Sequence, residues 1–231
     1  MDIYGDFLKD YCLSTLKTEV LLHNNYGDAE ELPVDAFFRN EDEMPDIETF
    51  ALSLCKGKIL DIGAGTGTHS IVLQNRGFDV TAIEISKGAC EIMNLRNIKQ
   101  IVNQDVQTYQ AQKFDTLLLM MNGIGFCGYV DELKNFLLRA KDFLNPGGQI
   151  IFDSSDVAYL YENEQPDTAT YYGEIDYQYE YNGQKGDWFS WLYIDQDLMK
   201  KIATATGWKL QIIYEDEDQQ YLGVLSLISS F

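Results

Sequence analysis

Three glycines at alternate positions, Gly63, Gly65 and Gly67, follow an apolar run that ends in Asp61 and Ile62. Glycine has no Cβ, so it tolerates a positive φ and lets a ligand approach the backbone closely. A helix after the third glycine would offer unpaired amides, which attract polar or anionic ligand groups. The pattern therefore predicts a turn that binds a nucleotide-like ligand.

Spacing distinguishes two classes of enzyme that use such a turn. The dinucleotide fingerprint G-x-G-x-x-G/A needs its third glycine or alanine at the position of Thr68, and here the third glycine is Gly67. The spacing favours an S-adenosylmethionine enzyme over a dinucleotide enzyme. A tight turn without a ligand is the remaining alternative.

Two further acids follow predicted strands. Glu84 comes 21 residues after Gly63, near the spacing at which a carboxylate accepts the two ribose hydroxyls of a nucleotide. Asp105 could accept from the exocyclic amine of adenine while the amide of Val106 meets a ring nitrogen. The alternatives are an ordinary exposed glutamate and a turn-forming aspartate.

Strand and helix signals alternate through the part of the chain that must position these residues, which indicates a parallel sheet. Open sheets of this kind bind ligands beyond the carboxyl ends of their strands. The predicted strands are 58–62, 78–83, 99–103, 114–121 and 149–153, with a turn at 145–148 and helices at 68–76, from 86, and across 133–144.

The flanking segments differ from this core. An amphipathic helix with Ile3, Phe7 and Tyr11 on one face begins the chain, and polar turns follow it. The strictly alternating run 174–181 predicts an antiparallel hairpin with 188–194. We expect four parts: an N-terminal helical cap (1–44), the core (45–156), an inserted β-hairpin or lid (157–194), and a C-terminal helix with a closing hairpin (195–231), whose strands are 208–214 and 220–227.

Composition narrows the class of protein. A formal charge of −20 disfavours a nucleic-acid partner, because such binding relies on Lys and Arg. No apolar run reaches the ~18 residues that a membrane-spanning helix requires. Four widely spaced cysteines and two histidines predict no metal site, and with the acidic first residues they favour a reduced, cytoplasmic protein.

Together, the run Asp61–Gly67, then Glu84, Asp105 and the segment 145–148, resemble the class I S-adenosylmethionine-dependent methyltransferases. The resemblance covers about residues 56–156 and the terminal hairpin. It implies an α/β, Rossmann-like, seven-stranded and mostly parallel sheet with an antiparallel last strand. It also implies S-adenosylmethionine as cofactor and S-adenosylhomocysteine as product, with cofactor contacts from Asp61, Gly63, Gly65, Gly67, Glu84, Asp105, Val106 and Asn122.

The segments 121–125, 152–156 and 183–186 look like an uncharacterised bacterial branch of that family, which names no substrate. The motif Asn/Asp-Pro-Pro-Tyr/Phe of many amino-methylating enzymes is absent after the fourth strand. Arg39 is a candidate partner for the carboxylate of the cofactor, with an ordinary surface arginine as the alternative.

Methyl transfer from a sulfonium is an in-line displacement, which needs alignment and exclusion of water but no dedicated acid or base. We therefore assign no catalytic residue. The candidate acceptor-binding residues are Asn122, Asp153, Asp156, Tyr177 and Trp191. The alternative role is turn formation for the two aspartates and packing for the two aromatic residues.

The leading hypothesis is a cytoplasmic methyltransferase that acts on a small molecule. The alternatives are a protein methyltransferase, a non-catalytic interaction protein with the same fold, and an NAD-dependent oxidoreductase. The sequence predicts no acceptor atom and no oligomeric state.

Overall fold

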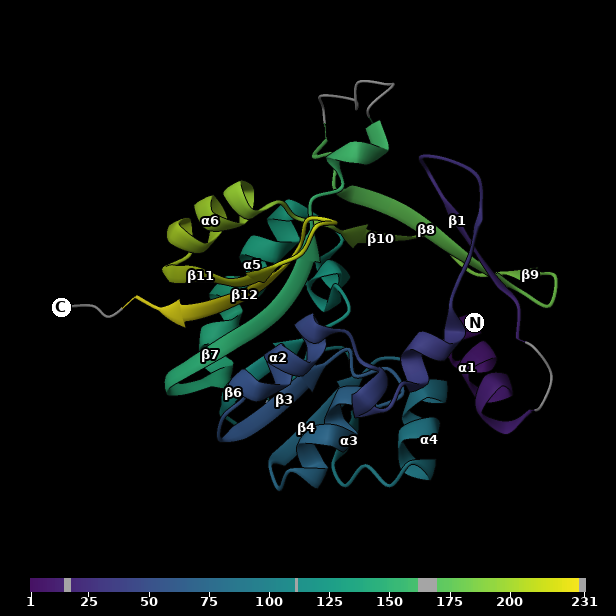
Figure 1. Cartoon of the computed structure of the whole chain (residues 1–231), viewed down its shortest axis with the longest axis horizontal. Coiled ribbons are helices and arrows are strands. Elements are labelled where there is room, and N and C mark those ends of the chain that lie inside the picture. Colours follow the sequence, from purple (N-terminus) through teal and green to yellow (C-terminus); the bar gives the residue numbers. More distant parts are fainter. Residues whose placement is uncertain (15–17, 111, 162–169, 229–231) are drawn as a thin grey trace. The chain divides into compact units, whose positions relative to one another are not determined.

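The computed structural model describes residues 1–14, 18–110, 112–161 and 170–228, and its larger sheet has seven strands (Figure 1). β6 is parallel to β7 and β4 to β5, whereas β12 is antiparallel to both β7 and β11. The predicted mostly parallel sheet with an antiparallel last strand is confirmed. In sheet order the strands are β11 (Trp208–Glu215), β12 (Gln220–Leu227), β7 (Leu144–Ser155), β6 (Phe114–Leu119), β3 (Lys58–Ile62), β4 (Asp79–Glu84) and β5 (Ile101–Asn103).

Side-chain and glycine caps mark the ends of the core helices. Gly67 is the N-cap of α3, and the Ser86 hydroxyl caps α4 by accepting from the amide of Ala89. Asp195 caps α6 by accepting from the amide of Leu198. The predicted helices are confirmed as α3 (Thr68–Asn75), α4 (Lys87–Leu95), α5 (Val130–Ala140) and α6 (Gln196–Ala205), and α2 (Asp46–Leu54) precedes β3.

The sequence predicts a helical cap at the N-terminus, but the structure has strands in this segment as well. After α1 (Ile3–Leu13) come the strands β1 (Val20–Asn24) and β2 (Glu30–Glu31) and the 3-10 helices η1 (Val34–Phe38) and η2 (Glu41–Glu43). β1 pairs antiparallel with β2 and with β8 (Glu174–Tyr181). The strand was missed because it pairs with a segment from a distant part of the chain.

Two turns also differ from the prediction. Asn182 and Gly183, both with positive φ, form a two-residue turn that pairs β8 with β9 (Gln184–Lys185), and β10 is shortened to Phe189–Leu192. The predicted turn at 145–148 lies within β7, where a register shift against β6 accommodates the extra residues. Residues 162–169 of the predicted insert lie outside the described part.

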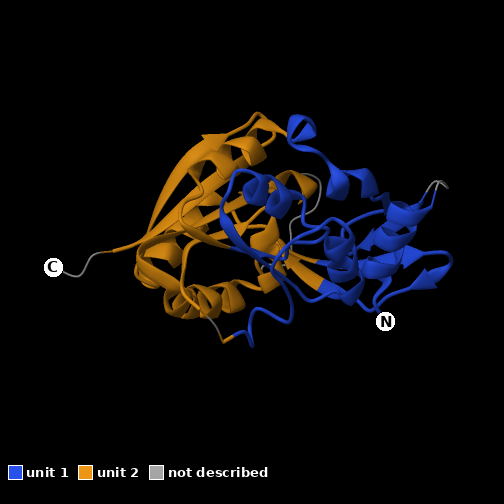
Figure 2. Cartoon of the chain, turned by 90° about the horizontal axis from the view of Figure 1, so that it is seen from below, with its two compact units in different colours: residues 1–44, 60–109, 176–189 blue, residues 45–59, 110–175, 190–231 orange. Residues whose placement is uncertain are grey.

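The chain divides into two compact units (Figure 2). Unit 1 consists of residues 1–44, 60–109 and 176–189, and unit 2 of residues 45–59, 110–175 and 190–231. Unit 1 contains the predicted cofactor residues apart from Asn122, and unit 2 contains the predicted acceptor residues apart from Tyr177. The predicted division into four parts remains a prediction.

Each unit has its own buried apolar groups. In unit 1, Phe7 and Leu8 of α1 pack with Ala89 and Ile92 of α4. In unit 2, Trp208 is fully buried, and its indole Nε1 donates to the Leu137 carbonyl at 3.0 Å. This bond satisfies the polar end of a large core side chain.

We expect Trp208→Phe to lower the free energy of unfolding by about 1–3 kcal/mol, because the buried Leu137 carbonyl loses its indole donor. Trp188→Phe is the matched control, since Trp188 is 53% exposed, and its change should stay within about 0.5 kcal/mol. Urea unfolding measures both. Equal losses in the two variants would contradict the assignment of the indole bond.

Candidate functional site

The glycine turn (residues 63–67) has a backbone that requires glycine at each alternate position. Gly63, Gly65 and Gly67 have φ values of 69°, 54° and 82°. The amides of Gly63 and Ala64 donate to the carbonyl of Ile83 in β4, which fixes the turn. A Cβ added to Gly63 would meet no heavy atom within 4 Å, so the backbone is open to a ligand there.

The Glu84 carboxylate lies at the end of β4 and supports this turn. Its Oε2 accepts from the Gly65 amide at 2.9 Å, and its Oε1 accepts from the Ser86 amide at 2.8 Å. Burial raises the pKa of the carboxyl above its usual range, although these amides oppose the rise. Each carboxylate oxygen keeps acceptor capacity for a ligand hydroxyl.

Asp61 lies beneath the turn and joins β3 to α3. It is 2% exposed, and the hydroxyl of Ser70 donates to its Oδ2 at 2.6 Å. Burial raises the pKa of Asp61, while the charge of His69 and the Ser70 bond oppose the rise. The structure gives Asp61 a supporting role, and direct contact with a cofactor remains a prediction.

Asp105 and Val106 form a turn after β5. Asp105 Oδ1 accepts from the amide of Gln107 at 2.8 Å, so the turn-forming role is observed. Asn103 donates to the carbonyls of Glu84 and Ile85, both at 2.9 Å, and so joins the carboxyl ends of β4 and β5. An adenine contact from Asp105 and Val106 remains a prediction.

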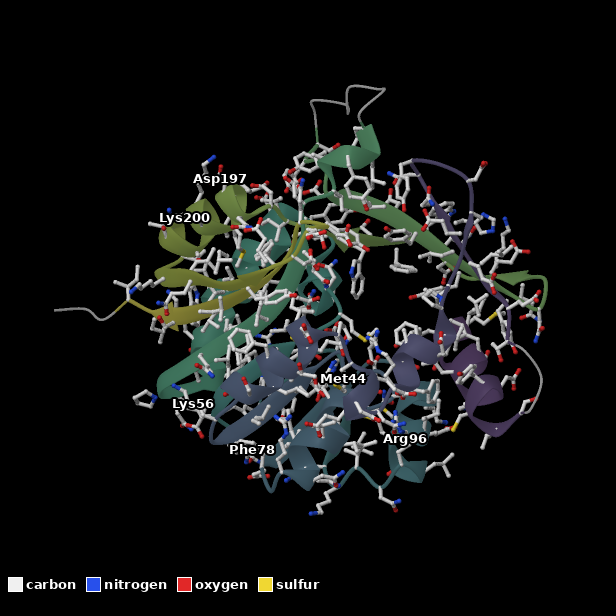
Figure 3. The ribbon with its side chains drawn as sticks, in the orientation of Figure 1. Met44, Lys56, Phe78, Arg96, Asp197 and Lys200 are labelled. Carbon is white, nitrogen blue, oxygen red and sulfur yellow. The ribbon has the colours of Figure 1, made fainter. Side chains whose placement is uncertain are left out.

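A second network holds η1 against the glycine turn. The hydroxyls of Thr66 and Thr68 both donate to the carbonyl of Phe37. Arg96, at the C-terminal end of α4 and labelled in Figure 3, donates from Nη1 to the Thr66 carbonyl at 3.0 Å and to both hydroxyls. Arg39 follows η1 two residues after Phe37, and its contact with a cofactor carboxylate remains a prediction.

In unit 2, Asp153 shapes the turn that follows β6. The backbone amide of Asn122 donates to Asp153 Oδ1 at 2.9 Å and to Oδ2 at 3.0 Å, and Gln220 donates to Oδ2 at 2.9 Å. Met121 and Asn122 both have positive φ, which is uncommon for residues with side chains. The Asp153 carboxylate is therefore a support for a strained turn.

The Asn122 side chain is held at its nitrogen. Its Nδ2 donates to the carbonyl of Leu192 at 3.2 Å, and its backbone carbonyl accepts from the indole of Trp191 at 3.1 Å. Within the described residues, Asn122 Oδ1 is buried and accepts no hydrogen bond. An orphaned buried acceptor of this kind is rare in proteins, and it points to a ligand that can donate.

The two remaining acceptor candidates have structural roles. Asp156 Oδ1 accepts from the Ala158 amide at 2.9 Å and from the Tyr172 hydroxyl at 2.8 Å, as the turn alternative expects. Tyr177 is buried in unit 1 and packs edge-on to Tyr26. The structure brings Asn122, Asp153 and Trp191 together, and an acceptor contact from Asp156 or Tyr177 remains a prediction.

Several site residues escaped the sequence analysis. Thr66, Thr68 and Arg96 form the network on Phe37. In the N-terminal segment, Tyr4 reaches Gly65 of the turn, and Asp2 reaches the start of α4. The available signal was the scarcity of basic residues, which could have drawn attention to Arg96.

The described ranges contain neither a metal-binding cluster nor a membrane-spanning helix. No cluster of three or more His, Cys, Asp or Glu side chains there could hold a metal ion. No helix in those ranges combines the length and the apolar character that crossing a membrane requires.

Comparison with known proteins identifies the class of this site. The family described as a methyltransferase domain matches residues 29–211. A solved S-adenosylmethionine-dependent methyltransferase from Bacteroides fragilis, in complex with S-adenosyl-L-homocysteine, is 36% identical with a TM-score of 0.91. The match covers 98% of this chain and 94% of that chain.

Curated relatives match over a shorter segment. A demethylmenaquinone methyltransferase from Tropheryma whipplei is 32% identical over 101 residues, which are 41% of this chain and 40% of that protein. The cypemycin N-terminal methyltransferase of a Streptomyces species is 28% identical over 104 residues, 43% and 42% of the two chains. The match thus spans about two fifths of the length of these relatives.

We expect Gly125→Ala to displace the Trp191 indole, because the new Cβ would lie 2.1 Å from Nε1. The indole would then lose its bond to the Asn122 carbonyl, and overpacking would cost about 1–3 kcal/mol of stability. A red shift of tryptophan emission in a Trp188→Phe background reports the displacement. Gly27→Ala is the control, since its Cβ would meet nothing closer than 3.9 Å, and a red shift of equal size there would refute the prediction.

Proposed function

This chain belongs to the S-adenosylmethionine-dependent methyltransferases, and we propose that it transfers the methyl group of S-adenosylmethionine to an amine or hydroxyl of a small acceptor. The cofactor is S-adenosylmethionine, and the product is S-adenosylhomocysteine. The observation that carries the assignment is the glycine turn, whose Gly65 amide is held by the buried Glu84 carboxylate.

The residues of unit 1 fit this cofactor. The open space at Gly63 admits the methionine part close to the backbone. Glu84 presents acceptors for the two ribose hydroxyls. Ile85, 70% exposed directly after Glu84, offers an apolar surface for the adenine ring, whose edge would meet Asp105 and Val106.

The charged end of the cofactor has one candidate partner. Arg39 would pair with the carboxylate of the methionine part, and the bonds from Thr66 and Thr68 to Phe37 keep the preceding η1 at the turn. A guanidinium matches a carboxylate with two parallel hydrogen bonds. Asn122 as a further cofactor contact also remains a prediction.

For the acceptor, we propose that Asn122 Oδ1 receives a hydrogen bond from the N–H or O–H that becomes methylated. The amide cannot present its nitrogen there without giving up the bond to the Leu192 carbonyl. The molecule that accepts the methyl group must therefore donate a hydrogen bond to this oxygen. This requirement supports an amine or hydroxyl over a carbon or thioether as the methylated group. A buried oxygen suits a small molecule or the end of one side chain.

Bound S-adenosylmethionine supplies a methyl group on a positively charged sulfur. The protein contributes alignment: Asn122 orients the lone pair of the acceptor, and Trp191 helps to exclude water around it. Asp153 already accepts three hydrogen bonds, so its role is to hold the Asn122 turn. The proposed chemistry assigns no general base.

Peptide and nucleic-acid acceptors fit the structure less well than a small molecule. One relative is named for demethylmenaquinone and the other for the N-terminus of cypemycin, so both small-molecule and peptide acceptors occur among similar proteins. The buried Asn122 oxygen favours the small molecule. A charge of −20 argues against a nucleic acid.

We also propose a cytoplasmic location. None of the four cysteines, all within the described residues, forms a disulfide, and Cys55, Cys90 and Cys127 are buried. Buried reduced thiols are typical of a reducing compartment.

Calorimetry should detect binding of S-adenosylhomocysteine, and Glu84→Gln should weaken it about 10- to 100-fold through loss of charge-assisted bonds to ribose. Burial raises the pKa of Glu84 above the ordinary value of 4.5, and the ribose hydroxyls prefer its ionised form. Affinity should therefore be full above the raised pKa and fall as the pH drops through it. In Glu84→Gln this dependence should disappear.

Glu217→Gln removes the same charge from an exposed site and should bind like the unsubstituted protein. Absence of binding to the folded, unsubstituted protein would refute the proposed function. Preferential binding of NADH would favour the oxidoreductase alternative.

Asn122→Gly should lower methyl transfer about 10- to 100-fold, because the variant keeps the left-handed backbone and loses the oxygen that orients the acceptor. The Kd for S-adenosylhomocysteine, measured beside the rate, separates the two predicted roles of Asn122. A Kd within about twofold of the unsubstituted protein assigns the loss to the acceptor, and a larger rise assigns it to the cofactor contact. The assay follows a labelled methyl group into a cell extract and separates small molecules from proteins by ultrafiltration.

Asn182→Gly is the matched control, an exposed left-handed asparagine in the β8–β9 turn. Label in the protein fraction would instead support the protein methyltransferase. Cofactor binding without any labelled acceptor would support the non-catalytic alternative.

A further inference from the structure

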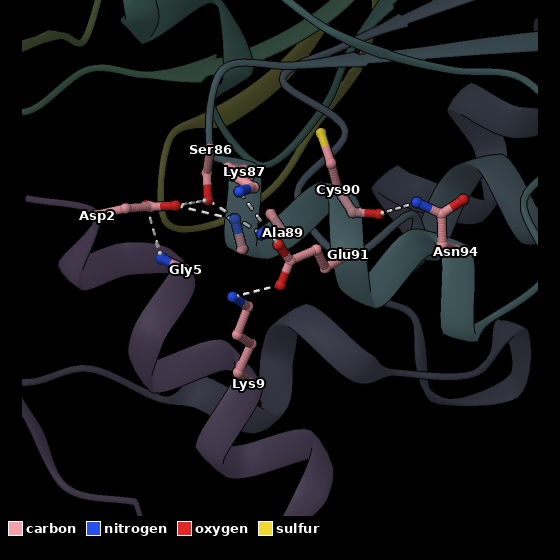
Figure 4. Close-up of polar contacts among 10 residues, drawn as sticks. Asp2, Gly5, Lys9, Ser86, Lys87, Ala89, Cys90, Glu91 and Asn94 are labelled. Atoms are coloured by element: carbon pink, nitrogen blue, oxygen red, sulfur yellow. Dashed lines mark hydrogen bonds and ion pairs between the residues drawn. The ribbon is translucent and has the colours of Figure 1, made fainter.

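One carboxylate joins α1 to the start of α4 (Figure 4). Asp2 Oδ1 accepts from the Gly5 amide at 3.0 Å, which caps α1. Asp2 Oδ2 accepts from the Ser86 hydroxyl at 3.0 Å and from the Gly88 amide at 2.9 Å. The same side chain therefore caps one helix and binds the first turn of another.

Two glycines allow the helices to come this close. A Cβ on Gly5 would lie 2.7 Å from the Cα of Gly88, and a Cβ on Gly88 would lie 2.5 Å from the Cα of Gly5. An ion pair between Lys9 and Glu91, at 2.5 Å, adds a contact on the same pair of helices. Asp2 could not reach α4 if either glycine carried a side chain.

The contact continues to the cofactor residues. Ser86, which donates its hydroxyl to Asp2, also donates its amide to Glu84 Oε1 at 2.8 Å. The other oxygen of Glu84 accepts from the Gly65 amide. A continuous series of hydrogen bonds thus runs from Asp2 through Ser86 and Glu84 to the glycine turn.

Tyr4, on the same helix, reaches the turn directly. Its hydroxyl lies 3.0 Å from the point where Gly65 would carry a Cβ. The ring is held edge-on by Phe7 and Phe37 and stacked on Tyr179, at centroid distances of 5.4–5.9 Å. Burial keeps the pKa of the Tyr4 hydroxyl well above its usual range, and the Glu84 charge adds to this, so the phenol remains a donor.

We propose that helix α1 completes the cofactor site, with Asp2 as a positioning residue that sets the Glu84 carboxylate through Ser86, and with Tyr4 donating a hydrogen bond to an oxygen of the bound cofactor. The inference rests on the proposed binding of S-adenosylmethionine at the glycine turn. Docking of α1 and binding of the cofactor then stabilise each other, because each favours the same arrangement of Glu84. The rigid ring contacts of Tyr4 lower the ordering cost of its bond.

The test compares variants on one helix. Asp2→Ser retains a helix-capping hydroxyl but is too short to hold α4 as well, and Tyr4→Phe removes only the hydroxyl. Each should raise the Kd for S-adenosylhomocysteine about 10-fold, the value of one good hydrogen bond to a ligand. The KM for S-adenosylmethionine should rise similarly, while kcat at saturating cofactor should stay within about twofold.

The controls are Asp6→Ser, an exposed acid in the first turn of α1, and Tyr11→Phe, a ring stacked on Phe38. Both control variants should bind S-adenosylhomocysteine with the Kd of the unsubstituted protein. A purely structural role for Asp2 as helix cap would be rescued by serine, so normal affinity in Asp2→Ser would overturn its positioning role. Normal affinity in Tyr4→Phe would overturn the donor role.

Hydrogen exchange gives a second, independent measurement. S-adenosylhomocysteine should slow amide exchange in α1 of the unsubstituted protein, and less so in Asp2→Ser. Unchanged exchange in α1 on binding would contradict the coupling even if the Asp2 variant proved unstable. If the unsubstituted protein bound no S-adenosylhomocysteine, the proposed function itself would fail, which separates that failure from a failure of this inference.

Discussion

The arrangement of unit 1 depends on the buried carboxylate of Glu84. A buried charge is costly unless hydrogen bonds satisfy it, and here the amides of Gly65 and Ser86 do so from two directions. The glycine turn and the start of α4 are therefore held by one side chain. The same carboxylate is the predicted ribose acceptor, so we propose that the group that positions the backbone also recognises the cofactor. Burial raises the pKa of this carboxyl, and the bonds from the two amides oppose the rise.

Unit 2 uses a second buried carboxylate in a comparable way. Both oxygens of the Asp153 carboxylate accept from the backbone amide of Asn122. These bonds hold Met121 and Asn122 in the left-handed region. Sterically unfavourable backbone of this kind persists only where surrounding contacts maintain it, and it is often found at ligand sites. Glu84 and Asp153 thus both hold the backbone of a turn in place. That is consistent with methyl transfer, in which alignment of donor and acceptor can contribute most of the rate enhancement.

Sequence patterns predicted the elements whose causes are local. Alternate glycines, a serine before α4 and alternating residues in β8 predicted the turn, the helix start and the strand. Predictions were wrong where a distant partner decided the outcome. Val20–Asn24 becomes a strand by pairing with β8, and residues 145–148 stay within β7 because β6 pairs with β7 on both sides of them, at Leu144 and again from Gln149. Asp105 and Asp156 show the same limit, because turn-forming and ligand-binding aspartates share one local signature.

The sequence by itself determined the order of strands and helices from β3 to β7, the left-handed glycine turn and the class of cofactor. These follow from steric limits on φ and from hydrophobic periodicity, both of which act within a few residues. Only the tertiary structure placed Asp2 against Ser86, Phe37 against Thr66, and Trp191 against Asn122. Those contacts join residues far apart in the chain, and hydrogen bonds between such residues form only after the core has packed. We propose the acceptor class from another such contact, the bond from Asn122 Nδ2 to the Leu192 carbonyl, because it leaves Oδ1 of the side-chain amide to accept from a ligand.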